Sequence, residues 1–78
     1  MKLLKIPYNK KYTNAKPMKG ALAISKIIKE EYGLEHSKDY SWTWHPTDKI
    51  LVIAFNDEHE SLASMIGLRF MGVDLYEI

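Results

Sequence analysis

Cysteine is absent from the 78 residues, so disulfide bonds, thiolate zinc sites, thiol nucleophiles and iron–sulfur clusters are excluded. A chain without cysteine suits a reducing compartment. No run approaches the roughly 18 apolar residues that a membrane-spanning helix needs, and the stretch 1–8 lacks the continuous apolar segment of a secretory signal. The sequence therefore predicts a soluble, cytoplasmic protein with no membrane partner.

Arginine is almost absent as well, since Arg69 stands against ten lysines. Arg69 is therefore the single residue that could bind a carboxylate or phosphate through the planar, bidentate guanidinium group. There is no glycine-rich phosphate loop and no supported Ser–His–Asp arrangement. We therefore predict a protein that is not an enzyme, with no catalytic residues and no cofactor.

The composition that remains is that of an ordinary folded domain, with 46% hydrophobic and 27% charged residues. A chain of this length has room for one modest core, so we predict a single domain over 1–78. The net charge of +1 conceals an asymmetry. Residues 1–29 hold eight lysines and no acid, whereas residues 39–78 hold seven acids against Lys49 and Arg69. Such a pattern suggests contact with anions, unless the folded chain mixes the two halves in space.

The spacing of apolar residues predicts six elements. Period-2 alternation indicates strands, and a spacing of three to four residues indicates helices. Pro17 suits the first position of a helix, and Gly33 followed by Leu34 suits its end. The predicted elements are a strand over 2–8, a helix over 17–32, a strand over 40–45, a strand over 49–55, a helix from about 57 that Gly72 ends, and a strand over 73–78.

This order, βαββαβ, resembles the ferredoxin-like fold. The resemblance implies an α+β architecture in which two helices pack on one face of a four-stranded antiparallel sheet. It implies no activity, because many unrelated functions share the fold. The strand over 49–55 is apolar on both faces, which predicts that something also covers the face that the helices leave open.

An aromatic row offers anchors for a partner on that face. Tyr40, Trp42 and Trp44 alternate along one strand, and buried aromatic residues carry much of the affinity of protein interfaces. Lys10, Lys11 and Tyr12 would add a peripheral charged contact. We predict that these six residues bind a partner protein or a second copy in a homodimer. One version is a phage-encoded or accessory regulator that inhibits a host nucleic-acid-handling enzyme.

Two other functions are considered, nucleic-acid binding by the aromatic row and metal binding at His59. The aromatic row could stack bases of single-stranded RNA or DNA while the basic loop around Lys10 contacts phosphates. However, the strand Lys49–Phe55 lacks the aromatic pattern of RNA-recognition modules. His59 lies among acids over 57–60 and could ligate a metal, but acids also suit the first turn of a helix. We therefore predict no metal site.

Overall fold

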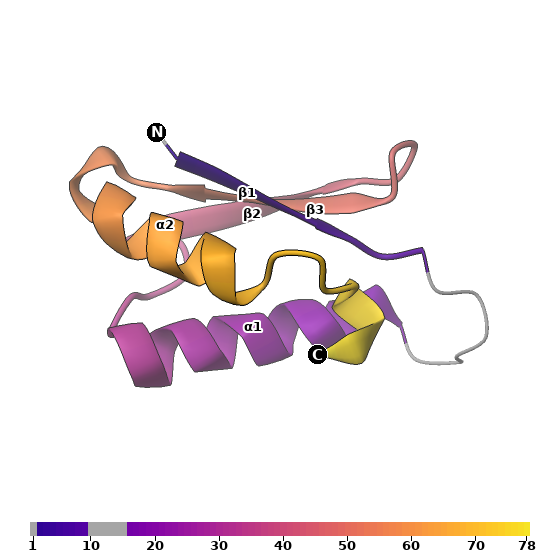
Figure 1. Cartoon of the computed structure of the whole chain (residues 1–78), viewed down its shortest axis with the longest axis horizontal. Coiled ribbons are helices and arrows are strands. Elements are labelled where there is room, and N and C mark those ends of the chain that lie inside the picture. The colour runs from indigo at the N-terminus through magenta and orange to yellow at the C-terminus, as the bar shows by residue number, and fades with distance from the viewer. Residues whose placement is uncertain (1, 10–15) are drawn as a thin grey trace.

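The structure is a computed structural model that describes residues 2–9 and 16–78. Both helices lie on the same side of one sheet (Figure 1). The α+β class predicted from the sequence is therefore confirmed. The elements are strand β1 (Lys2–Pro7), helix α1 (Pro17–Tyr32), strand β2 (Tyr40–His45), strand β3 (Ile50–Phe55), the 3₁₀ helix η1 (Asp57–His59), helix α2 (Glu60–Arg69) and the 3₁₀ helix η2 (Leu75–Glu77).

Within the described residues the sheet has three strands in the order β1-β3-β2, and both pairings are antiparallel. The prediction of a four-stranded ferredoxin-like sheet is therefore wrong. The three strands keep the order expected of that fold: β3 lies between β1 and β2, which run parallel to each other. The predicted last strand over 73–78 is not formed; this segment holds two irregular residues followed by the helix η2 instead. Among the described residues, β1 consequently forms an edge of the sheet.

The contact between Gly20 and Leu75 explains why the chain ends in a 3₁₀ helix. Gly20 is buried in the first turns of α1, and a Cβ atom there would collide with the carbonyl oxygen and side chain of Leu75. The missing side chain thus lets η2 press against α1. Leu75 is fully buried, which contributes roughly 1.5–3 kcal/mol. Asp74 also fixes this turn, because its carboxylate accepts hydrogen bonds from the backbone N–H groups of Tyr76 and Asn9, each at 3.0 Å.

Helix α1 begins and ends where its sequence predicts. Pro17 is its first residue, where the absent N–H group costs nothing. Gly33 adopts the left-handed conformation with φ of 72° and donates to the carbonyl of Lys29, while Leu34 donates to the carbonyl of Ile28. The bond from Gly33 to Lys29 is the one that defines the αL motif, and both bonds satisfy carbonyls that the helix end leaves open.

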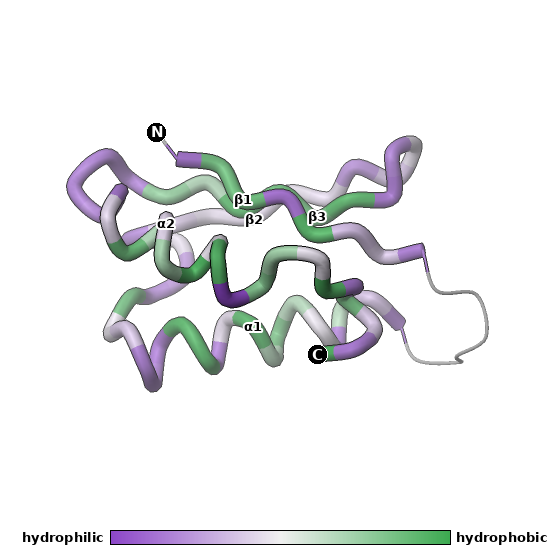
Figure 2. The backbone as a smooth tube through the Cα atoms, viewed as in Figure 1, coloured by the Kyte–Doolittle hydropathy of each residue, from purple (hydrophilic) through white to green (hydrophobic). Residues whose placement is uncertain are grey.

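The register of the strands separates the sheet into two faces. On the helix-covered face, Leu51, Ile53 and Phe55 of β3 are buried. Residues Ile50, Val52 and Ala54 of the same strand lie on the other face and are partly exposed. Figure 2 shows β3 largely in hydrophobic colours, whereas hydrophilic residues interrupt β1. The sequence-based expectation that β3 is apolar on both faces is thus confirmed. No helix of the described part could cross a membrane.

Candidate functional site

A groove runs between strand β1 and helix α2 and has a volume of about 310 Å³. It lies on the side of β1 where a fourth strand of the ferredoxin-like fold would pair. We call it the edge groove. Three of the large apolar side chains along it are unusually accessible, with exposed fractions of 49% for Leu3, 69% for Leu68 and 71% for Met71. The edge groove is lined by Lys2, Leu3, Leu4, Ala63, Ser64, Gly67, Leu68 and Met71.

The outer edge of β1 also presents backbone groups. The N–H of Tyr8 donates to the carbonyl of Lys49 at 3.0 Å. This bond sets the alternation, so that Leu4 and Ile6 are the residues of β1 whose backbone groups bond to β3. Because bonding alternates along an antiparallel strand, the N–H and C=O groups of Leu3 and Lys5 point away from β3. Pro7 presents only a carbonyl on this edge. No strand of residues 2–9 and 16–78 pairs with these groups.

The open face of the sheet meets the edge groove at Leu3. Leu3 lies opposite Ala54, and Lys5 lies opposite Val52 in the next position of the same face. On β2, this face carries exposed Ser41, Thr43 and His45. The apolar part of the open face therefore lies on β1 and β3, beside the groove, and the two form one continuous surface.

The aromatic row of β2 lies on the opposite, helix-covered face. Tyr40 is 3% exposed, while Trp42 and Trp44 are partly buried and pack against the core. The ring of Trp44 meets the ring of Tyr8 edge to face at 5.3 Å between centroids. The row therefore does not form a platform on the open face. The aromatic row packs in and against the core and so stabilises the fold. Its role in binding a partner stays a prediction.

The remaining predicted contact residues, Lys10, Lys11 and Tyr12, lie outside the described residues. The structure therefore does not test whether they lie near the aromatic row. The strand and helix that flank them are β1 and α1. Their predicted peripheral contact stays a prediction.

Two polar atoms of the aromatic row, the hydroxyl of Tyr40 and Nε1 of Trp42, are buried without a hydrogen bond to any of the described residues. Burial raises the pKa of Tyr40, and the nearby Ser25 hydroxyl partly offsets this effect. The two hydroxyl groups nevertheless do not meet in hydrogen-bond geometry. An unsatisfied buried polar group costs about 1–3 kcal/mol, so both atoms lower the stability of the fold.

A wider hollow of about 520 Å³ lies between α1 and the segment before β2. Its lining combines Lys26 and Lys29 with Glu35 and His36, above the ring of Tyr40. The Tyr40 hydroxyl has no accessible surface, so a molecule in this hollow could not bond to it. The charges around the hollow are of both signs, and the structure shows no selective polar anchor here.

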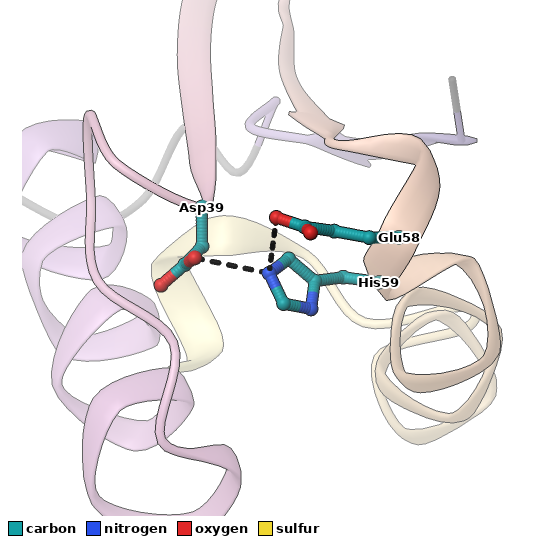
Figure 3. Close-up of side chains that lie close together, drawn as sticks. All are labelled: Asp39, Glu58 and His59. Atoms are coloured by element: carbon teal, nitrogen blue, oxygen red, sulfur yellow. Dashed lines mark hydrogen bonds and ion pairs between the residues drawn. The ribbon is translucent and has the colours of Figure 1, made fainter.

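A cluster of Asp39, Glu58 and His59 joins the start of β2 to η1 (Figure 3). His59 Nε2 lies 3.0 Å from Asp39 Oδ1 and 3.4 Å from Glu58 Oε1. The other oxygen of Asp39 accepts the backbone N–H of Glu35 at 2.8 Å. The hydrogen bond from Glu35 is the main cause that lowers the pKa of Asp39; desolvation partly opposes it, and the interaction with His59 lowers the pKa further.

The atoms of this cluster could ligate a divalent cation, because one potential ligand atom from each residue lies within 4.8 Å of the others. Their arrangement is also explained without an ion. The imidazole bonds to Asp39 across 20 residues of sequence, and Asn56 donates from its side-chain amide to the carbonyl of Lys38 at 3.0 Å. These bonds clamp the two segments together. The positive end of the helix dipole beside η1 and α2 favours the carboxylates and opposes a cation.

Comparisons with models of protein families, with curated protein sequences and with solved structures find no match for this chain. Leu68 of α2 and Met71, which lies in the turn just after α2, are absent from the site predicted from the sequence. The sequence does contain a signal for them, because residues 62–71 hold more apolar side chains than one buried stripe requires.

Proposed function

We propose that this protein is a non-enzymatic, protein-binding module whose contact surface is the edge groove with the adjoining open face. The observation that supports this proposal is that Leu3, Leu68 and Met71 gather around one groove. About half or more of each of these apolar residues is exposed. Single exposed apolar residues are normal on a protein surface, whereas a continuous apolar patch marks an interaction site.

The surface has the composition that protein interfaces favour. Its centre is apolar, with leucine and methionine side chains that can adapt to a partner. Lys2 and Lys5 lie at its border and could steer an acidic partner. A module of this size would act by occupying a surface of its partner, as an inhibitor or accessory regulator does. A cytoplasmic location belongs to the same proposal, since a chain without cysteine suits a reducing compartment.

The test is capture of partners from a nuclease-treated lysate with the wild-type protein and two matched variants. Leu68→Glu places a charge in the edge groove, whereas Leu22→Glu places the same charge on α1, where Leu22 is 59% exposed. We expect a protein that is captured by the wild type and by Leu22→Glu to be lost with Leu68→Glu. Equal capture by both variants would reject the edge groove as the contact surface.

A nucleic-acid-binding function remains the alternative proposal. The lysines of residues 1–29 support it, although the open face offers no aromatic side chain on β2. This alternative predicts that binding to a single-stranded oligonucleotide falls steeply between about 50 and 200 mM salt. Absence of oligonucleotide binding at the lower salt concentration would reject it.

A further inference from the structure

We propose that the outer edge of β1 binds an extended segment of another protein as a fourth strand of the sheet, and that this segment alternates apolar and acidic residues. The inference rests on the proposed protein-binding function and names the chemistry of the partner. Strand addition of this kind is a common mode of peptide recognition, in which backbone bonds provide affinity and side-chain pockets provide specificity.

The backbone of β1 is available for such pairing. The N–H and C=O groups of Leu3 and Lys5 point outward, as does the carbonyl of Pro7. Pro7 has no N–H to offer, so pairing ends there. The added strand would therefore align with the first part of β1, which is also the part that lines the edge groove with Lys2, Leu3 and Leu4.

The edge groove determines which side chains the added strand needs on its helix-facing side. Successive side chains of a strand point to opposite faces. One set would lie over α2 and the turn after it, where Gly67 leaves space and Leu68 and Met71 are exposed. Apolar side chains fit this position, because they would bury the accessible surface of both residues.

The other set of side chains would lie on the open face beside Lys5. Lys5 is exposed, and Lys2 stands at the end of the groove. No acidic residue lines the edge groove among the described residues. Opposite charges on neighbouring strands attract each other, and like charges directly opposite are destabilising. Lys5 therefore favours acidic over basic residues on this face of the added strand.

The same lysines disfavour a second copy of this protein as the occupant. If β1 paired with β1 of another copy, the two strands would together carry four lysines and no acid. The protein's own C-terminal segment is also engaged elsewhere, because Leu75 is fully buried against α1. A foreign acidic strand is thus the occupant that these charges and contacts favour.

The experiment uses the full chain and an end-blocked peptide in which valine and glutamate alternate. Amide hydrogen exchange is measured by NMR with and without the peptide. In the free protein, we expect fast exchange at Leu3 and Lys5 and slow exchange at Leu4 and Ile6, which bond to β3. The peptide should slow exchange at Leu3 and Lys5 by roughly tenfold or more at saturation, because its carbonyls would accept their N–H groups.

Charge reversal then tests the chemistry of the partner. Lys5→Glu should weaken binding of this peptide by about tenfold, because one attractive pair becomes repulsive. It should strengthen binding of the matched peptide in which lysine replaces glutamate. Lys29→Glu makes the same change of charge on α1, away from the edge groove, and should alter binding less than about twofold.

The outcomes separate this inference from the proposed function. No binding of the glutamate peptide at about 1 mM, or binding without protection of Leu3 and Lys5, overturns strand addition. Protection of both amides in the free protein, with doubled mass by light scattering, identifies a second copy and also overturns it. Either result leaves the Leu68→Glu capture experiment intact as a test of protein binding.

Discussion

Gly20 and Leu75 lie so close that the carbonyl oxygen and side chain of Leu75 occupy the space of a Cβ atom on Gly20. Gly20→Ala should therefore destabilise the protein by about 1–3 kcal/mol, although alanine is the better helix former. Urea unfolding measures the change. Gly67→Ala on α2 is the control, because a Cβ there would meet Leu4 Cδ1 at an ordinary 3.7 Å. We expect that substitution to stabilise by up to about 1 kcal/mol, and equal effects would contradict the argument.

The buried Tyr40 hydroxyl has no hydrogen bond within residues 2–9 and 16–78, so its removal should increase the stability of the fold. We expect Tyr40→Phe to raise the free energy of unfolding by about 1 kcal/mol, since the phenyl ring keeps the packing and loses the desolvated group. Urea unfolding at neutral pH tests this. A loss of stability of similar size would show that the hydroxyl has a partner in solution.

Alkaline pH gives a second test of the same group. Burial raises the pKa of Tyr40 in the folded protein, so its ionisation favours the unfolded chain. The stability that the neutral group contributes is complete below the unfolded pKa of about 10 and is lost as pH rises through the folded value. Unfolding free energies between about pH 9 and pH 11 should fall less steeply in Tyr40→Phe than in the wild type. Identical slopes would contradict the burial of this phenol.

Asp39 should make the protein sensitive to acid. Its folded pKa is lowered by the Glu35 N–H and by His59, so its contribution is present above the unfolded pKa of about 3.9 and is lost as pH falls through the folded value. Asp39→Asn should reduce the dependence of stability on pH below about 4, as followed by circular dichroism. Asp48→Asn removes a charge from the exposed hairpin turn and controls for charge alone. An unchanged acid transition in Asp39→Asn would contradict the prediction.

The clamp around His59 predicts a response to metal as well. Since Asp39 and the helix dipole account for its geometry, Zn²⁺ should leave the thermal midpoint unchanged relative to a chelator control. His59→Ala should lower the midpoint equally with and without the ion. A rise with Zn²⁺ that disappears in His59→Ala would instead establish a metal site.

The sequence allowed prediction of those elements whose signals are local. Pro17 and Gly33 bound α1 through backbone preferences that need no knowledge of the rest of the fold. The alternation in 40–45 and 49–55 likewise predicts the hairpin of β2 and β3. The segment 73–78 was mispredicted because six alternating residues do not distinguish a strand from a short turn with one buried leucine. That choice depends on Gly20, which lies 55 residues away from Leu75.

For the candidate site, too, local patterns could be predicted from the sequence, whereas contacts between distant residues could not. Alternation places Tyr40, Trp42 and Trp44 on a common face of β2, but it does not say which face the helices cover. The edge groove was missed for a related reason. Leu68 and Met71 are exposed because no fourth strand lies over them in the described residues, so their role follows from the corrected topology.

Pro7 and the two lysines of β1 also bear on solubility at high concentration. An open strand edge is a template on which identical chains can stack into fibres. Here Pro7 removes one backbone donor from the edge, and Lys2 and Lys5 place like charges between stacked copies. The features that leave the edge receptive to an acidic strand therefore also act as gatekeepers against amyloid-like growth.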